Sequence, residues 1–432
     1  MEALERIARF ALQALQDAGA DMAWVEATRQ ETREFSVESG DFSLFRSLFD
    51  NSLSLTAFQG GRKGSRRLNR FDAASIRSAA AECLAVAASG IADEAWSLNP
   101  EPEQADFCWG APEPELEAFF HRCRELKETM ETEYPDILSD SMIFLHVGEQ
   151  SVYVNTNGAL FRERGGNYEV SLSFSGHREG QSSSFFYSGF LTDDLSTPFL
   201  SRATLAEDLQ SARNAVETRS VGDTFEGTVL LHPNCLSDFL GIAAGSFASD
   251  SCLIDGTSIW KDKLNEPVAD SRLSVSIAPL DSRILGGERY TAEGHISEDY
   301  DFIRDGVLRS FLLSRYGAAK TGLRRSANTD SCMVLAPGDT PLSELIAGID
   351  RGLLVGRLSG GNPGASGDFS GVAKNSFLIE KGKVTDAVSE TMLAGNLAQL
   401  LQNVAGISRE LVCDGAAVLP WVAFRGVTVS GG

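Results

Sequence analysis

The chain has 432 residues, 43% of them hydrophobic, and its 38 basic and 60 acidic side chains give a formal net charge of −22. The length predicts two or three domains, and the composition is that of a globular protein with a sizeable core. The acidity argues against general binding to nucleic acid or to an anionic membrane, and no apolar run reaches the roughly 18 residues of a membrane-spanning helix.

Seven cysteines are spread along the chain without a C-x-x-C pair. That spacing favours neither a disulfide framework nor a cysteine-based zinc module, and it fits a reducing cytoplasm best. The N-terminus has no basic segment followed by an apolar stretch, so no signal peptide is expected. The sequence therefore predicts a cytoplasmic protein.

Residues 1–220 predict an N-terminal α+β domain in which helices cover an antiparallel sheet. Apolar residues at helical spacing predict a helix over residues 4–15, and Asp72 is a suitable N-cap for a second helix. Alternating apolar residues and turn residues predict strands near the start of the chain. Three such strands are expected, at residues 24–32, 34–39 and 53–57.

A sub-boundary is expected at residues 97–115, where four prolines alternate with acidic residues as in an extended connector. An amphipathic helix follows at residues 116–130, and an Asn-Gly pair at residues 157–158 predicts a hairpin. Thr204 and Glu207 have the spacing of a capping box and predict the start of another helix.

Residues 221–432 predict a β-rich C-terminal domain. Gly-containing pairs at residues 305–306 and 381–382 lie between strand-like segments and predict hairpins. Short helices are expected at residues 236–247, 342–349 and 397–404. Because strands dominate at dispersed positions, we expect a barrel-like or sandwich domain and an α+β class for the whole chain.

One junction in this region has the setting of a metal site. A strand-like segment at residues 227–231 runs into His232, and a helix-like segment begins at Pro233. A metallopeptidase would have a His-Glu pair here and a second His one helical turn later, because that turn aligns two imidazoles on a metal and sets the Glu beside its bound water. Here the Glu position is Pro233, and the helix contains no second His.

Three further stretches resemble the TldD/PmbA family of bacterial and archaeal proteins linked to metal-dependent proteolysis. They occur in the family's order and span most of the C-terminal half, at residues 287–322, 359–370 and 377–397. The resemblance implies two groups. Catalytic members have a His-Glu-x-x-x-His helix and a later Cys as a third zinc ligand, whereas PmbA-type members, also called TldE, lack this motif and pair with a catalytic subunit.

Matched residue by residue, His232 stands at the first His of the motif, Pro233 at the Glu and Ser237 at the second His. The chain therefore resembles the PmbA side of the family. A lone imidazole binds zinc weakly, and the general base is missing, so we expect no peptide hydrolysis by this chain alone. The alternative interpretation of His232, without a role in chemistry, is a histidine at a strand end that caps a helix or faces solvent.

The resemblance implies a non-catalytic subunit, without a cofactor, that binds or positions an unfolded peptide for a zinc-bearing TldD-like partner. Two alternatives stay open. The chain could be a stand-alone homodimeric peptide-binding protein. It could also be an independent metal-dependent peptidase with a non-standard site, built from Glu293, His295 and His232.

The Gly-rich loop at residues 356–371 is the predicted contact with peptide, because glycines let backbones approach closely and form main-chain hydrogen bonds. The alternative is an ordinary long connection. The residues assigned to the peptide are Gly360, Gly361, Asn362, Pro363, Gly367, Asp368 and Ser370.

A basic cluster and one cysteine are interpreted separately. Arg62, Lys63, Arg66 and Arg67 form a basic cluster, but no aromatic platform or DNA-binding motif accompanies it. We expect a charged hairpin end that pairs with acids on a neighbouring subunit. Cys413, at an expected strand end, is interpreted as a buried structural cysteine.

Overall fold

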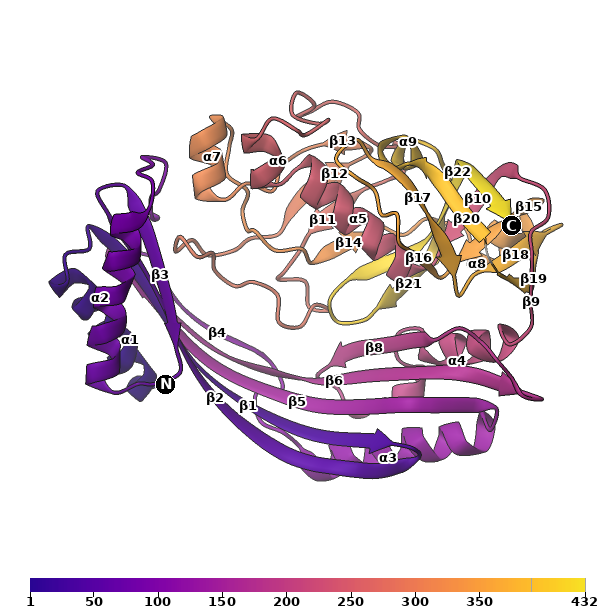
Figure 1. The fold of residues 1–432 in the computed structure, drawn as a ribbon, viewed down its shortest axis with the longest axis horizontal. Coiled ribbons are helices and arrows are strands. Elements are labelled where there is room, and N and C mark those ends of the chain that lie inside the picture. Colours follow the sequence, from indigo (N-terminus) through magenta and orange to yellow (C-terminus); the bar gives the residue numbers. More distant parts are fainter. Residues whose placement is uncertain (390, 432) are drawn as a thin grey trace.

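The computed structural model describes residues 1–389 and 391–431, and it contains two large β-sheets with helices packed against them (Figure 1). The first sheet belongs to the N-terminal half of the chain and the second to the C-terminal half. This arrangement confirms the predicted α+β class.

The first sheet has the strand order β3-β2-β1-β5-β6-β4, and β7 and β8 also pair with β6. Its strands are β1 (Met22–Glu38), β2 (Asp41–Gln59), β3 (Arg62–Leu68), β4 (Gln104–Gly110), β5 (Ile137–Asn155), β6 (Leu160–Arg178), β7 (Gln181–Ser182) and β8 (Phe186–Thr192). The two strands expected on either side of Arg33 are one strand, because β1 pairs with β2 and β5 without a break there. The expected connector contains β4, which pairs in parallel with the start of β6.

The helices of this half are α1 (Glu2–Asp17), α2 (Ala73–Ser89), α3 (Leu116–Glu133) and α4 (Leu205–Asn214), together with the 3-10 helix η1 (Phe199–Ser201). Asp72 caps α2 as predicted, since its carboxylate accepts a hydrogen bond of 2.9 Å from the Ser75 amide. The capping box at Thr204 is wrong. The Thr204 hydroxyl donates instead to the carboxyl of Asp208, at 2.8 Å.

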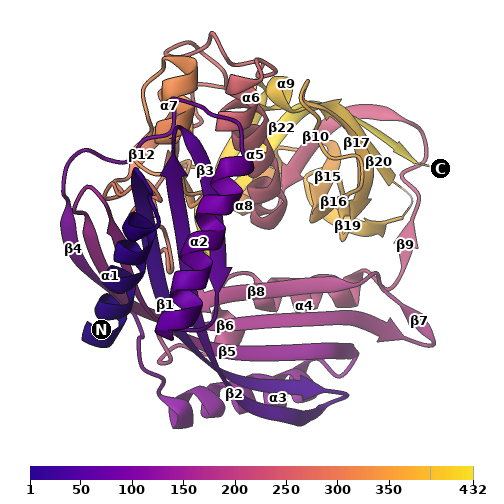
Figure 2. The ribbon, with the colours of Figure 1, turned by 60° about the vertical axis from the view of Figure 1, so that its left-hand side comes forward.

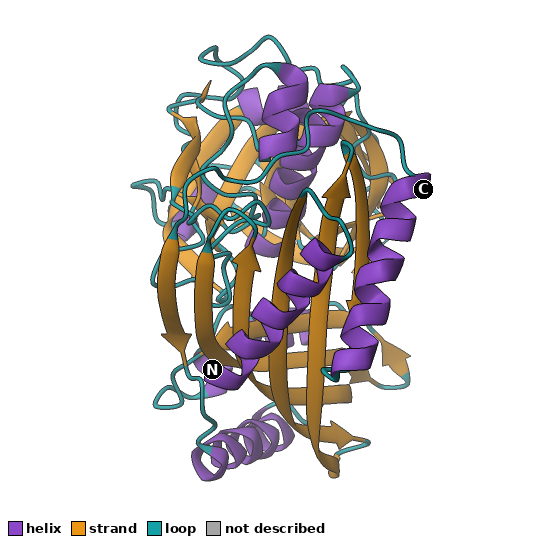
Figure 3. Ribbon diagram, turned by 90° about the vertical axis from the view of Figure 1, so that its left-hand side faces the viewer, coloured by secondary structure: helices purple, strands orange, loops and turns teal. Residues whose placement is uncertain are grey.

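Two separate cores hold the helices to the first sheet. Figure 3 shows two long helices lying across its outer face, and Figure 2 identifies them as α1 and α2. Their buried residues, such as Leu4 and Leu84, pack with Val25 and Leu55 of the strands. A second core joins α3, α4 and η1 to the far half of the sheet, and it also includes Phe377 from the C-terminal half.

The second sheet follows the order β13-β12-β11-β14-β22-β10-β15-β18-β19-β9, with β16, β17, β20 and β21 attached as branches. Its path through the described residues ends at β13 and β9, so these strands do not close into a barrel. The strands are β9 (Thr218–Arg219), β10 (Phe225–Leu231), β11 (Val275–Ile277), β12 (Tyr300–Arg304), β13 (Val307–Leu308), β14 (Met333–Leu335), β15 (Arg351–Val355), β16 (Arg357–Ser359), β17 (Asp368–Lys374), β18 (Phe377–Glu380), β19 (Lys383–Val388), β20 (Thr391–Asn396), β21 (Val404–Cys413) and β22 (Val418–Gly431).

Both predicted hairpins of this half are confirmed, as β12–β13 and β18–β19. Its helices are α5 (Pro233–Phe247), α6 (Asp250–Ile254), α7 (Arg315–Thr321), α8 (Leu342–Ala347) and α9 (Leu397–Gln402). The three expected helices correspond to α5, α8 and α9. The sequence did not predict α6 and α7, because five and seven residues are too few to show helical periodicity.

The N-terminal and C-terminal halves of the chain contact each other at both ends of the interface between them. At one end the rings of Trp96 and Tyr316 stack with centroids 3.9 Å apart, and Asp93 accepts hydrogen bonds of 2.9 Å from Tyr316 and Lys320. At the other end, β8 is the strand of the first sheet nearest the second sheet (Figure 1). None of the helices in the described residues is both long and apolar enough to cross a membrane.

Candidate functional site

A cavity of about 570 Å³ lies between the two halves, beside β8 and α4 on one side and the start of α5 on the other. Its wall combines aromatic rings with charged and polar groups. The lining includes Tyr187, Asp208, His232, Ser237, Asp238, Arg357, Phe377 and Asp414. Two of the three motif positions identified from the sequence, His232 and Ser237, therefore face one cavity, while Pro233 is buried in the core.

His232 caps α5. It follows the last residue of β10, and its Nδ1 accepts a hydrogen bond of 3.3 Å from the Asn234 amide. Pro233 occupies the first helical position, where a missing amide proton removes no helical hydrogen bond. The helix-capping interpretation of His232 is confirmed. The side chain does not face open solvent, since it is only 13% exposed.

The second ring nitrogen of His232 has no hydrogen-bond partner among the described residues. Because Nδ1 accepts a bond, the proton of the neutral ring resides on Nε2. Burial lowers the pKa of His232 to about 4, so the ring is neutral at pH 7. The Nε2 atom lies 3.9 Å from Oδ1 of Asp208, which is too far for a hydrogen bond. The wall of the cavity thus contains an N–H donor without an acceptor.

Asp208 supplies a matching acceptor from α4. Its Oδ2 atom accepts hydrogen bonds of 2.8 Å from the hydroxyls of Ser188 and Thr204. Burial raises the pKa of the carboxyl to about 6, so it is mostly ionised at pH 7. A donor at the start of α5 and an acceptor on α4 therefore lie 3.9 Å apart in the lining of the cavity without satisfying each other.

These residues do not fit a zinc ion. Zinc sites in proteins use three or four converging ligands, and here the only imidazole has one nitrogen engaged in the cap. Within residues 1–389 and 391–431 there is no group of three His, Cys, Asp or Glu side chains arranged to hold a metal.

The non-standard metal site proposed from the sequence does not assemble. The two histidines have different neighbours: Nδ1 of His295 lies 3.8 Å from Oε1 of Glu103, whereas His232 packs against Asp208 and Trp421. Burial, followed by the charges of Arg325 and Arg315, lowers the pKa of His295 to about 4. Two neighbouring arginines would also repel a cation.

The Gly-rich loop between β16 and β17 folds onto itself. The carbonyl of Gly361 accepts a hydrogen bond of 3.0 Å from the Ser370 amide, and Gly361 has a φ of +56°. A Cβ atom on Gly361 would lie 1.7 Å from the carbonyl oxygen of Ser370. The close approach that these glycines permit is therefore within the loop.

The far end of the loop is anchored by Asp368 and Gly367. The Asp368 carboxylate accepts hydrogen bonds of 2.9 Å from Asn396 and 2.8 Å from Ser366, which hold its pKa below the usual value. A Cβ on Gly367 would lie 3.3 Å from the ring of Phe247, the last residue of α5. Because α5 has 15 residues, this point is roughly 20 Å from the helix start. The loop end and the His232 cavity thus lie at opposite ends of α5.

The strand β8 contributes an edge to the site that the sequence did not predict. It pairs with β6 on one side only. On its other side, the Leu191 amide donates to the carbonyl of Asp414 at 2.7 Å, and the Asn375 side chain donates to the carbonyl of Phe185 at 3.1 Å. Both bonds come from the C-terminal half, and they hold the two ends of this edge.

Between these two bonds the edge of β8 is open to the cavity. Backbone groups of alternate residues point to the same side of a strand, so the amides and carbonyls of Tyr187 and Gly189 face the way Phe185 and Leu191 do. Both residues line the cavity, and no hydrogen bond in the described part of the chain takes up these groups on the open side. A strand edge is visible only once the pairing of the whole sheet is known.

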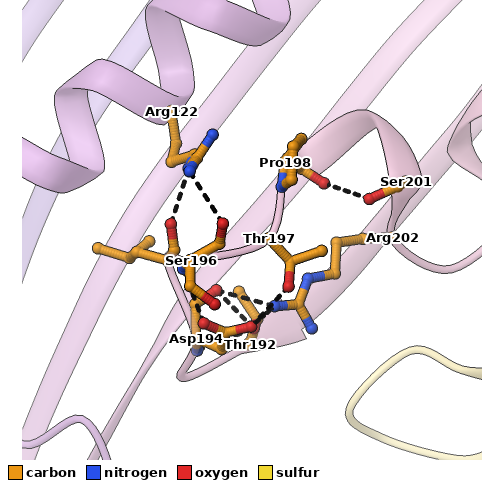
Figure 4. A network of polar contacts seen from close by, with 9 residues as sticks. Arg122, Thr192, Asp194, Ser196, Thr197, Pro198, Ser201 and Arg202 are labelled. Carbon is orange, nitrogen blue, oxygen red and sulfur yellow. Dashed lines mark hydrogen bonds and ion pairs between the residues drawn. The ribbon is translucent and has the colours of Figure 1, made fainter.

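A network of polar contacts at the end of β8 ties residues 192–202 to one another and to α3 (Figure 4). The Asp194 carboxylate pairs with Arg202 and accepts hydrogen bonds of 2.7 Å from the Ser196 amide and 2.8 Å from the Thr197 hydroxyl. Hydrogen bonds from Ser196, first among several, hold the pKa of Asp194 well below its usual range. Arg122 of α3 donates a hydrogen bond of 2.9 Å to the carbonyl of Ser196, so the segment that follows β8 is attached to α3.

The remaining candidates lie away from the cavity. The basic cluster is on β3, where Arg66 pairs with Glu82 at 3.3 Å and the Lys63 ammonium lies 4.6 Å from the ring centre of Trp96. Its pairing with a neighbouring subunit stays a prediction. The interpretation of Cys413 as buried is wrong, because this residue ends β21 and is exposed. A strand end next to a turn leaves its side chain in solvent.

Comparisons with known proteins agree with this fold. Residues 224–431 match the family model of the PmbA/TldA metallopeptidase C-terminal domain. A metalloprotease of Methanothermobacter thermautotrophicus is 30% identical over 195 residues, which are only 42% of each chain. A metalloprotease PmbA homolog of Haemophilus influenzae is 23% identical over 94% of this chain and 92% of its own length. The crystal structure of TldE from Thermococcus kodakarensis has a TM-score of 0.83 at 20% identity, covering 99% of this chain and 100% of that one, and shows the same fold.

Proposed function

Because the chain belongs to the TldD/PmbA family of metalloprotease-related proteins, we propose that it is a non-catalytic, PmbA/TldE-like subunit. In this role it holds an unfolded peptide for a zinc-bearing, TldD-like partner. The absence of hydrolysis by the chain alone follows from Pro233 and Ser237, which provide neither a general base nor a second imidazole at the motif positions.

The open edge of β8 is the observation that carries peptide binding. An extended peptide can add to a sheet edge through main-chain hydrogen bonds, which are independent of its sequence. Tyr187 and Gly189 offer two amides and two carbonyls at this edge, enough for about three residues of an added strand. The bonds from Asp414 and Asn375 block the edge on either side, so the added strand would be short.

The cavity wall would complete such a site. The unpaired Nε2 proton of His232 can donate to a peptide carbonyl, and the Asp208 carboxylate can accept from a peptide amide or amine. Both groups are already partly desolvated in the free protein. Hydrogen bonds to a peptide would therefore compensate a desolvation free energy that the protein already bears. In this proposal the loop at residues 360–370 shapes the far end of α5 and contributes no direct peptide contact.

Peptide binding is tested with a fluorescent unfolded peptide and two variants at one position. Tyr187→Pro removes the outward amide and should weaken binding at least about tenfold, whereas Tyr187→Ser keeps that amide and should retain most of the affinity. A peptide with N-methylated amides should bind neither form. Equal affinity of the N-methylated and unmodified peptides would contradict strand addition.

The subunit role is tested separately. Pull-down of the full chain from native lysate should recover a zinc-bearing partner, and the purified chain alone should contain no stoichiometric zinc and cleave no unfolded peptide. Tight metal binding with cleavage by the isolated chain would overturn the proposal. Recovery of this chain alone, with peptide binding intact, would favour a stand-alone binding protein instead.

A further inference from the structure

The open stretch of β8 is closed at both ends by groups of the C-terminal half. The Asn375 side chain donates to the carbonyl of Phe185 at 3.1 Å, and the Leu191 amide donates to the carbonyl of Asp414 at 2.7 Å. A peptide that ran straight along the edge would need the backbone positions that these bonds occupy. A peptide that ends within the stretch leaves the edge in one direction only. The closed stretch therefore fits the end of a peptide better than its middle.

Asp208 of α4 lies beside this stretch. Its Oδ2 atom accepts a hydrogen bond of 2.8 Å from the hydroxyl of Ser188, the residue between the two open positions, whereas its Oδ1 atom accepts none from the described residues. Asp208 is buried, and within residues 1–389 and 391–431 no Lys or Arg forms an ion pair with it. Carboxylates are rarely buried in proteins unless they are paired with a cation. This carboxylate therefore lacks a positive partner.

The charge of the cavity favours a cation. Asp208, Asp238, Asp414 and Arg357 contribute to its lining, and the imidazole of His232 is neutral at pH 7. Of the four charged side chains only Asp208 is buried, and Arg357 is exposed. The carboxylate end of a peptide would place a second negative charge beside Asp208, where partial desolvation strengthens the repulsion. The amino end is therefore the end of a peptide that fits.

We propose that this cavity binds the free amino end of a peptide. The terminal ammonium donates to Oδ1 of Asp208, and the carbonyl of the same first residue accepts from Nε2 of His232. The ammonium nitrogen and the carbonyl oxygen of one residue are roughly 3 Å apart. The Oδ1 and Nε2 atoms are 3.9 Å apart, so one amino-terminal residue can reach both. The inference rests on the proposed function, because it requires that the cavity holds peptide.

An ammonium complements Asp208 better than an internal peptide amide does. An amide donates a hydrogen bond but leaves the negative charge in place, whereas an ammonium donates and also neutralises it. Burial raises the pKa of this carboxyl to about 6, which shows that the isolated charge is unfavourable in the free protein. Acetylation of the amino end of a peptide removes the positive charge and leaves a single N–H donor. It should therefore weaken binding.

Calorimetric titration of the full chain with two peptides tests the inference. One peptide is Ala-Leu-Ala-Leu amide with a free amino end, and the other is the same peptide with that end acetylated. Both lack a carboxylate, so they differ only at the amino end. Acetylation should raise the dissociation constant at least about tenfold. Equal binding of the two peptides by the wild type would overturn the inference.

Two variants on α4 test whether Asp208 is the group that recognises the ammonium. Asp208→Asn removes the charge but keeps an oxygen for the hydroxyls of Ser188 and Thr204, and its dissociation constants for the two peptides should agree within about twofold. Glu207→Gln is the matched control, because Glu207 precedes Asp208 in α4 but does not line the cavity, and it should keep the preference. A preference that persisted in Asp208→Asn, or that disappeared in both variants, would refute the role of Asp208.

Failure of this inference and failure of the proposed function give different results. If the wild type bound the free and the acetylated peptide equally well, only the recognition of the amino end would be refuted, and strand addition would stand. If the wild type bound neither peptide, the peptide site and this inference would both be refuted. The comparison of the two peptides on the wild type does not depend on the folding of any variant.

Discussion

Replacement of Glu163 should make the protein more stable in a pH-dependent way. This residue of β6 lines a cavity of about 340 Å³ together with Glu26 and Glu149, where the first sheet meets residues 286–290. Its carboxyl accepts a hydrogen bond of 2.6 Å from the indole of Trp109. Burial, reinforced by the charges of Glu149 and Glu26, raises the pKa of Glu163 to about 7.

The magnitude follows from that pKa. A rise from 4.5 to about 7 corresponds to about 3 kcal/mol in favour of the protonated side chain. The unfolded chain ionises first as pH increases, so this stability is present below pH 4.5 and is lost as pH rises through about 7. Glu163→Gln cannot ionise and still offers an oxygen to Trp109. The variant should therefore exceed the wild type by up to about 3 kcal/mol at pH 8 and differ little at pH 4.5.

Denaturant unfolding of both proteins at the two pH values provides the measurement. Glu113→Gln is the matched control, because the Glu113 side chain is 75% exposed and pairs with Arg164 at the surface. Its effect should stay within about 0.5 kcal/mol of zero at either pH. If Glu163→Gln shifted stability equally at pH 4.5 and pH 8, the reasoning about its ionisation would be refuted.

Three other changes have defined outcomes. Gly361→Ala should lower stability by at least about 1 kcal/mol in thermal unfolding, because the new Cβ would clash with Ser370 and because residue 361 has a φ of +56°. An unchanged melting temperature would contradict this close approach. The wild type should lose stability as pH falls from 6.5 towards 4, because burial lowers the pKa of His232 to about 4. His232→Gln should lose less over that range, and parallel pH profiles would argue against this assignment. Tyr316→Ala removes the stack on Trp96 and should lower the free energy of unfolding by about 1 kcal/mol or more, with a red shift in tryptophan emission. An unchanged emission spectrum would show that this stack does not stabilise the contact between the two halves.

Elements whose evidence is local were predictable from the sequence. The cap at Asp72, the turn at residues 157–158 and the hairpin turns at residues 305–306 and 381–382 are all present. In each case the residues that determine the conformation are within a few positions of one another. Turn and cap residues act on their own backbone, so distant packing changes them little.

Two of the three errors occurred where the pairing partners are distant in sequence. The break expected near Arg33 does not exist, because β2 and β5 both pair with β1 on either side of this position. The cap at Thr204 fails because its hydroxyl bonds Asp208, and β4 forms only because β6 is available to pair with it. Long-range pairing overrode local preference for β1 and β4, whereas the Thr204 cap was displaced by a contact only four residues away.

For the candidate site, the sequence by itself determined that the motif positions hold Pro233 and Ser237, which cannot act as a base or as an imidazole ligand in any fold. Only the tertiary structure decided what surrounds His232, since Asp208 and β8 reach it from the other half of the chain. It also decided that β8 has an open edge. An unpaired backbone is a property of the complete hydrogen-bond pattern, and no single segment encodes it.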